Sequence, residues 1–213
     1  MLQPAPHAAR PSRRRVITGL AAALAAPAFI RNARAQATRR LTPVQTEGPF
    51  YPVTLPADTD FDLLSQGAVH YAKGQPVSLT GTVIDTAGRA VRGAAVEIWQ
   101  CDQQGHYHHP GDGGRADTAF QGFGRVIVDA RGDYRFRTIK PVPYTGRTPH
   151  IHVKVRLAQR ELLTTQLYVA GDPGNERDGL WRRLDALDRA ALTVPFTRSA
   201  DGLQAQFEII VNA

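Results

Sequence analysis

The stretch GAAVEIWQCDQQGHY, residues 93–107, joins a strand pattern to a turn and ends on a tyrosine. Ala94, Val96 and Ile98 recur at every second position, which is the period of a strand with one buried face. The turn-forming residues between Asp102 and Gly105 then end the strand and deliver Tyr107. We therefore expect a half-buried strand whose far end presents a tyrosine.

Similar alternation recurs along the chain at a spacing of about 8–12 residues, a pattern typical of β-sandwiches. Strands are predicted at residues 75–84, 91–99, 126–128, 134–138, 150–157, 162–168 and 203–211. The fold class expected is all-β, a two-sheet β-sandwich with long loops, of which the glycine-rich stretch 110–124 is one. One short C-terminal helix is expected, because Leu180, Leu184, Leu187 and Ala191 follow helical spacing behind Asp178, a candidate N-cap.

Two tyrosines and a His-x-His pair are the candidate metal ligands: Tyr107, Tyr144, His150 and His152. On a strand His150 and His152 point to the same face, so two imidazoles can chelate one metal ion. A phenol has a free pKa of about 10, so only a strongly Lewis-acidic cation would deprotonate two tyrosines at neutral pH. Ferric iron meets that demand better than zinc, which prefers Cys, His and carboxylate ligands.

The residues around these ligands resemble the intradiol ring-cleavage dioxygenases, especially the protocatechuate 3,4-dioxygenase branch. The resemblance runs through most of the chain after residue 41. The matching stretches are QTEGPFYP (45–52), GAAVEIWQCDQQGHY (93–107), FRTIKPVPYTGRTPHIH (136–152) and TQLYVAGDP (165–173).

This resemblance implies a catalytic sandwich that holds Fe(III) through Tyr107, Tyr144, His150 and His152. The substrates implied are a small aromatic diol and O2, and the ring is cleaved between its two hydroxylated carbons to give a cis,cis-muconate-type diacid. The resemblance also implies that Tyr144 accepts a substrate proton and leaves the metal. Arg147 would stabilise negative charge on the ring, and Gln166 would border iron and substrate. No organic cofactor or external reductant is implied.

The chain departs from the protocatechuate enzymes in one loop. Their iron-bearing subunit has a longer insertion, including a tryptophan, where only Thr145 and Gly146 separate Tyr144 from Arg147 here. Because that loop helps to shape the pocket, the resemblance leaves the particular catechol open.

Two alternative functions stay open at this point. A non-catalytic, transthyretin-like β-sandwich binding module would explain the strands but not the four ligands. A zinc or copper hydrolase or oxidase could use the cluster His106, His108 and His109, but it lacks a carboxylate ligand with convincing spacing. For this cluster we favour a solvated loop tip.

Other residues near the motifs have structural interpretations. Trp99, Phe136 and Tyr168 are interpreted as core residues and Cys101 as an inert thiol. Residues 46–51 are expected to pack an aromatic pair on the sandwich, and the resemblance adds that they border the active site.

The first 35 residues are interpreted as a signal peptide, with an apolar stretch at about 19–30 and an Ala-x-Ala site at 33–35. The segment SRRRVI, residues 12–17, favours the twin-arginine route over an ordinary secretory leader. We therefore expect an exported protein, periplasmic or secreted. The apolar stretch is shorter than the ~20 residues that span a bilayer, so no stable membrane anchor is expected.

The remaining chain divides into an extended N-terminal arm (36–75) and the catalytic domain (76–213). The formal net charge of the chain is +7. Residues 1–35 contain six arginines and no acidic residue, so residues 36–213 carry a formal net charge of only +1. This balance gives no indication of a nucleic-acid partner. A homo-oligomer is expected, and the single cysteine excludes an intrachain disulfide framework.

Overall fold

The computed structural model describes residues 1–2, 39–200 and 202–213. The predicted twin-arginine segment and Ala-x-Ala site lie outside the described residues. Within the described part, no helix is long and apolar enough to cross a membrane.

One sheet is built around the long strand β3 (Pro76–Asp85). Strand β6 (Asp133–Ile139) pairs with one edge of β3 antiparallel, and β11 (Gly202–Gln206) and β12 (Ile209–Val211) pair parallel with the other. Strand β10 (Thr197–Ser199) extends the sheet beyond β11. The strand predicted at 203–211 is therefore interrupted between β11 and β12. The carbonyl of Phe207 in this interruption accepts a hydrogen bond from the Tyr134 hydroxyl at 2.6 Å.

The second sheet has the strand order β5-β4-β7-β8-β9. Its strands are β5 (Phe123–Ile127), β4 (Ala95–Trp99), β7 (His150–Leu157), β8 (Arg160–Val169) and β9 (Thr193–Val194). The register pairs Trp99 with His152 and His152 with Gln166, so these three residues form one row across the sheet.

Strand β5 begins three residues before its predicted start. Gly124, the last residue of the predicted glycine-rich loop, therefore lies inside this strand. A Cβ at that position would lie 2.6 Å from Leu63 Cδ1 and 2.8 Å from the carbonyl oxygen of Asp60, so a close chain contact excludes larger residues. The glycine marks close approach of the N-terminal arm to a strand.

The hydrophobic core lies between the two sheets, and the predicted sandwich is confirmed. The predicted inward positions Leu79, Val96, Ile98 and Phe136 each have no exposed surface. His150 and His152 alternate with Ile151 and Val153, which are part of the core, so the histidines lie on the other face of their sheet.

The N-terminal arm covers that other face. Gln45 donates a backbone hydrogen bond to Thr164 at 2.9 Å, and Gln166 Nε2 donates to the carbonyl of Thr46 at 2.9 Å. Within the predicted extended arm, a short hairpin forms from β1 (Ser65–Gln66) and β2 (Val69–His70).

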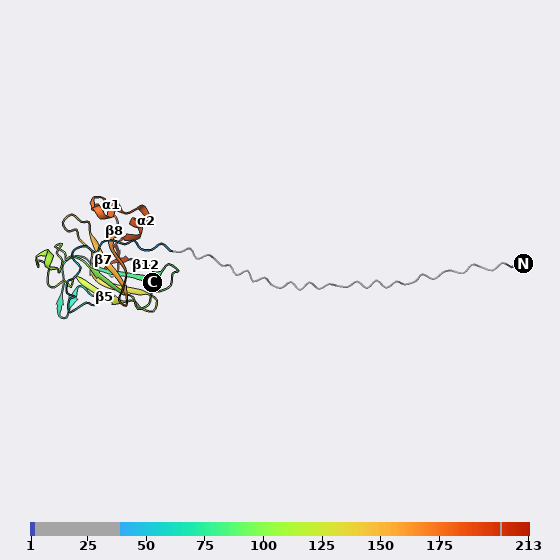
Figure 1. Ribbon diagram of the computed structural model, residues 1–213, viewed down its shortest axis with the longest axis horizontal. Coiled ribbons are helices and arrows are strands. Elements are labelled where there is room, and N and C mark those ends of the chain that lie inside the picture. The colour runs from blue at the N-terminus through green and yellow to red at the C-terminus, as the bar shows by residue number, and fades with distance from the viewer. Residues whose placement is uncertain (3–38, 201) are drawn as a thin grey trace. The chain divides into compact units, whose positions relative to one another are not determined.

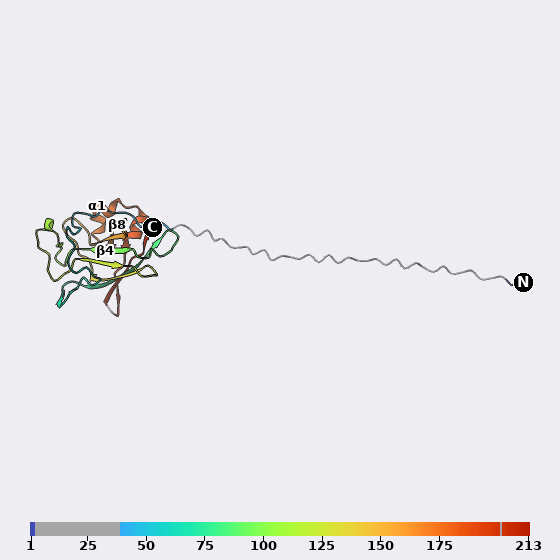
Figure 2. The ribbon, with the colours of Figure 1, turned by 60° about the horizontal axis from the view of Figure 1, so that its bottom comes forward.

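The prediction of one C-terminal helix is wrong, because the segment forms α1 (Gly179–Arg183) and α2 (Ala186–Leu192). Leu184 between them is extended, with φ −69° and ψ 144°, and Asp185 caps α2. The predicted N-cap Asp178 is confirmed. Short 3-10 turns η1 (Pro110–Asp112) and η2 (Asn175–Arg177) complete the elements. Both views show α1 on the side of the sandwich next to β8 (Figure 1 and Figure 2).

Candidate metal centre

Four aromatic rings meet on the outer face of the second sheet, under the N-terminal arm. Tyr107 lies 5.3 Å from Tyr144 between ring centroids, and Tyr144 lies 5.5 Å from His150. The ring centroids of His150 and His152 are 4.7 Å apart, and those of His152 and Tyr107 are 5.9 Å apart, so the four rings surround one point. The Nε2 atoms of the two histidines are 3.2 Å apart. The structure thus brings together all four predicted ligands.

Tyr144 and Arg147 stand at the two ends of a tight turn. The backbone N–H of Arg147 donates to the carbonyl of Tyr144 at 2.9 Å. Gly146 between them has φ +77°, a conformation that a glycine adopts without strain. The short connection places the phenol and the guanidinium beside each other.

Two buried or nearly buried carboxylates hold the loop that carries Tyr107. Asp112 accepts a hydrogen bond from the Tyr107 backbone N–H at 2.9 Å, and Asp102 accepts one from His106 at 3.0 Å. Side chains therefore satisfy these loop N–H groups, which a regular strand would pair with a neighbour.

The neighbouring histidines stabilise the same loop. His108 Nε2 is 2.6 Å from the carbonyl oxygen of Phe120, and His109 Nδ1 accepts from Gly111 N at 3.0 Å. His106 Nδ1 lies 3.3 Å from Asp112. Across residues 39–200 and 202–213, no three His, Cys, Asp or Glu side chains converge as a metal site. His108 and His109 thus have hydrogen-bond partners in the loop, whereas His106 Nδ1 is buried and makes no hydrogen bond among the described residues.

The electrostatics of the two histidines suit metal ligation. His150 Nδ1 donates to the carbonyl of Thr148 at 2.7 Å, which leaves its Nε2 as the nitrogen with a free lone pair. Burial lowers the pKa of His150 to about 3 and the pKa of His152 well below its usual value. Both imidazoles are therefore neutral near pH 7, as a metal ligand must be.

The tyrosines need a cation to ionise. Burial raises the pKa of Tyr107 well above 10, and burial also raises the pKa of Tyr144, although the nearby Arg147 opposes it. Tyr107 is 2% exposed, and its hydroxyl has no hydrogen-bond partner among the described residues. A buried phenol without a partner is costly, and a bound ferric ion would satisfy it. The residues present therefore fit such an ion.

Arg147 and Gln166, the other predicted site residues, contact each other. Arg147 Nη2 donates to Gln166 Oε1 at 2.6 Å, and the Tyr168 hydroxyl donates to the same oxygen at 3.1 Å. Gln166 has no exposed surface. Tyr168 is buried as predicted, but its hydroxyl also joins this polar group.

Two aromatic residues, Trp99 and Phe50, flank the ligand candidates, and only Trp99 has a different role from the one predicted. Trp99 is buried, but it belongs to a cluster around Tyr107 instead of the main core, and its ring stacks on His152 at 4.7 Å. Phe50 from the arm stacks on Tyr107 at 4.7 Å, so the arm both packs an aromatic pair and borders the site, as predicted. Trp99 directly follows Ile98, and adjacent residues of a strand point to opposite faces. This alternation was the sequence signal that Trp99 lies on the outer face.

Open pockets flank the turn at Tyr144. One of about 380 Å³ contains Arg147, Arg177 and Asp178. The other, of about 610 Å³, contains Phe50 and Arg115, and both include Tyr144. Tyr144 thus lines both of these pockets, whereas Tyr107 lines a smaller one of about 280 Å³ with Phe50 and Trp99.

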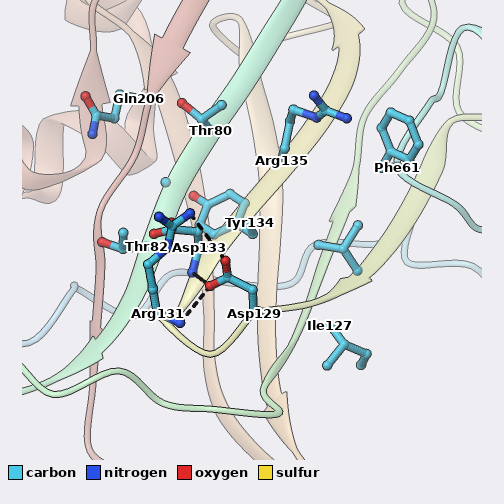
Figure 3. A pocket seen from close by; sticks show the side chains of 12 residues that line it. Phe61, Thr80, Thr82, Ile127, Asp129, Arg131, Asp133, Tyr134, Arg135 and Gln206 are labelled. Atoms are coloured by element: carbon cyan, nitrogen blue, oxygen red, sulfur yellow. Dashed lines mark hydrogen bonds and ion pairs between the residues drawn. The ribbon is translucent and has the colours of Figure 1, made fainter.

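A larger pocket of about 670 Å³ lies elsewhere, over β3 and β6 (Figure 3). Three of its charged side chains pair locally, with Arg131 3.0 Å from Asp133 and 3.6 Å from Asp129, and Arg135 lies over the Phe61 ring. None of the four ligand candidates lines it. Size alone therefore does not locate the chemistry of this chain.

Comparison with known proteins supports the same assignment. The dioxygenase family model (Dioxygenase_C) matches residues 46–212. Hydroxyquinol 1,2-dioxygenase of Corynebacterium glutamicum is 37% identical over 120 residues, which cover 48% of this chain and 38% of that protein. The protocatechuate 3,4-dioxygenase beta chain of Burkholderia cepacia is 34% identical over 155 residues, covering 65% of each. The chain thus spans less than two thirds of the length of both relatives.

A solved structure agrees in fold and in extent. The dioxygenase domain of a dioxygenase carbohydrate-binding protein fusion from Streptomyces sp. SirexAA-E is 31% identical, with a TM-score of 0.65. The match covers 82% of this chain and 99% of that one. On the family match and the shared sandwich, this chain belongs to the intradiol ring-cleavage dioxygenase family.

Proposed function

We propose that this chain is a non-haem Fe(III)-dependent dioxygenase that cleaves a catechol-type ring between its two hydroxylated carbons. The observation that supports it most is the convergence of two neutral imidazoles with two phenols, one of them buried and without a partner. Tyr107, Tyr144, His150 and His152 would hold the ion. Two phenols and two imidazoles suit ferric iron better than zinc.

When bound, the ferric ion would supply the Lewis acidity that activates a catechol toward dioxygen. Tyr144 is the phenol that we expect to accept a substrate proton, because it borders both open pockets. Tyr107 is buried and stacks on Phe50, and it is expected to remain a metal ligand when the substrate binds.

Arg147 would then stabilise the reaction electrostatically. Its guanidinium lines a pocket with Tyr144, where negative charge would develop on the ring. Gln166 would hold that guanidinium in place. The product would be a cis,cis-muconate-type diacid that contains both atoms of O2, so the reaction needs no external reductant.

The substituents of the ring are left to experiment. The two relatives named above act, by their names, on hydroxyquinol and on protocatechuate. Oxygen uptake by iron-loaded protein should be measured with catechol, protocatechuate, hydroxyquinol and chlorocatechols. We expect uptake with at least one, together with about one iron per chain and a visible phenolate-to-iron band. Colourless protein that binds a diol without consuming oxygen would instead favour a binding module.

We also propose that the protein is exported by the twin-arginine route. The supporting observation is the run Arg13-Arg14-Arg15 ahead of an apolar stretch and an Ala-x-Ala site. This route carries folded proteins, which would allow iron to be loaded before export.

A further inference from the structure

Asp178 is a fully buried carboxylate that joins Arg147 to the start of helix α1. Its Oδ1 accepts hydrogen bonds from the backbone N–H groups of Leu180 at 2.8 Å and Trp181 at 3.0 Å. Its Oδ2 accepts from Arg147 Nε at 2.7 Å and from the Thr148 backbone at 3.0 Å. One side chain therefore caps a helix and restrains the loop that carries the site arginine.

Arg147 is held at two of its three guanidinium nitrogens. Asp178 holds Nε, and Gln166 holds Nη2 at 2.6 Å. Two hydrogen bonds to different nitrogens of a planar group fix both its position and its plane. The Arg147 side chain is 16% exposed, so its freedom to move is small.

A helix cap alone does not require a carboxylate here, because Asn and Ser cap helices about as well as Asp. Burial raises the pKa of Asp178, but hydrogen bonds from Thr148, Trp181 and Arg147 outweigh it, so the pKa lies below its usual value. The carboxylate is therefore charged beside a charged arginine, and the pair forms a buried ionic contact. Such a charge is needed for Arg147 more than for the helix.

We propose that Asp178 is a positioning residue that holds the Arg147 guanidinium in its working orientation and couples it to helix α1. The proposal rests on the proposed function, in which Arg147 faces the reacting ring. A second contact strengthens the coupling: Thr148 Oγ1 donates to Asn175 Oδ1 at 2.8 Å, and Asn175 Nδ2 donates to the Val169 carbonyl at 2.9 Å. The segment that includes η2 and the start of α1 thus forms a rigid support behind the arginine.

The first test compares two helix caps. Asp178→Asn keeps an oxygen for the α1 N–H groups but removes the charge that pairs with Arg147. Asp185→Asn is the matched control, because Asp185 also caps a helix, α2, through Asp188 N at 2.7 Å and also pairs with an arginine, the exposed Arg40, which contacts none of the ligand candidates. We expect Asp178→Asn to lower kcat by about 10- to 100-fold with a smaller change in KM, as for loss of a supporting hydrogen bond. Asp185→Asn should leave kcat unchanged.

A double-mutant cycle separates positioning from a general effect on the fold. If Asp178 acts through Arg147, adding Asp178→Asn to Arg147→Ala should change kcat by less than about twofold. A similar loss in both backgrounds would overturn the proposal. Asp178→Ser, which can still cap α1 but is too short to reach the guanidinium, repeats the cycle if the Asn variant is unstable.

A measurement without substrate keeps the proposal distinct from the proposed function. In metal-stripped protein, where no paramagnetic ion broadens it, the Nε–Hε resonance of Arg147 in a ¹⁵N correlation spectrum, identified by its loss in Arg147→Lys, should exchange slowly with water. In Asp178→Asn we expect exchange at least about tenfold faster, and in Asp185→Asn no change. An unchanged Arg147 resonance in Asp178→Asn would refute the positioning contact, whereas absent catechol turnover in the unmodified protein would refute the proposed function alone.

Discussion

Replacing Tyr107 by phenylalanine should change stability in opposite directions with and without iron. The Tyr107 hydroxyl is buried and has no partner among the described residues. An unsatisfied buried hydroxyl costs about 1–3 kcal/mol, and phenylalanine removes it without leaving a cavity. We therefore expect the free energy of unfolding of metal-free Tyr107→Phe to exceed that of the metal-free parent protein by up to about 1–3 kcal/mol. The iron-loaded variant should be less stable than the loaded parent, because it has lost a ligand.

Tyr134→Phe is the matched control. Tyr134 is equally buried, but its hydroxyl donates to the Phe207 carbonyl at 2.6 Å, far from any ligand candidate. Its removal breaks a hydrogen bond and leaves a buried carbonyl oxygen with one partner fewer, so about 1–3 kcal/mol should be lost in both states.

Urea unfolding of metal-stripped and iron-loaded protein measures both effects on a common scale. Bound iron stabilises the native state by mass action. Loss of a ligand should therefore appear as a smaller increase in the free energy of unfolding when iron is added. If Tyr107→Phe destabilises the metal-free protein as much as Tyr134→Phe does, the Tyr107 hydroxyl is satisfied within the protein. Its assignment as a ligand held ready for the metal would then be wrong.

Three further outcomes are expected. Arg147→Ala should keep iron and its colour but lose about 10²-fold or more in turnover, as for one preorganised charge-stabilising donor, and full turnover in single-turnover kinetics would make Arg147 a surface charge. Because the pKa of His150 is lowered to about 3, the unfolded chain binds a proton below about pH 6.5 that the native chain excludes. His150 alone should therefore cost the metal-free protein roughly 1.4 kcal/mol of stability per pH unit as the pH falls from about 6.5 toward 3, and His152, whose pKa is also lowered, adds to the loss. Urea unfolding at several pH values should show a shallower loss in His150→Gln than in the parent protein. Replacing Arg13 and Arg14 by Lys should leave the precursor in the cytoplasm, as measured by cell fractionation. Normal export of that variant would indicate another route.

The sandwich could be predicted because its strands alternate strictly. Val77, Leu79 and Val83 on β3 face the core as the period-two pattern requires, and Ile151 separates the two histidines as expected. The ligand candidates were predictable for the same reason. Local alternation fixes which side chains share a face, and two tyrosines from loops complete the set.

What sequence could not supply was the pairing between distant segments. The helical spacing from Leu180 to Ala191 is real, but Asp185 starts a second helix that periodicity alone does not separate. Trp99 is buried as the sequence predicts, but on the face of the sheet that carries the histidines and not in the main core. Its neighbour His152 follows from register, and register depends on the whole sheet.

The N-terminal arm is the part of the site that local patterns described least well. Beside the row that contains His152, the register places Glu97 opposite Lys154, two charged residues that are 2% and 4% exposed. Buried charges persist only when they are paired. The arm supplies one partner to each, because the Tyr51 hydroxyl donates to Glu97 at 2.9 Å and Glu47 pairs with Lys154. Neighbouring strands supply the others, Arg125 for Glu97 at 3.7 Å and Glu161 for Lys154 at 3.4 Å.

The motif EGPFY in the arm thus has a physical reason for most of its letters. Glu47 neutralises Lys154, whose ammonium also lies 4.0 Å from the centre of the Tyr51 ring. Phe50 covers Tyr107, and Tyr51 meets the edge of the Trp99 ring that stacks on His152. The metal centre lies on the outer face of a sheet, where side chains are ordinarily exposed to solvent. Since the arm excludes water there, it is part of the site in the same sense as the strands that carry the ligands.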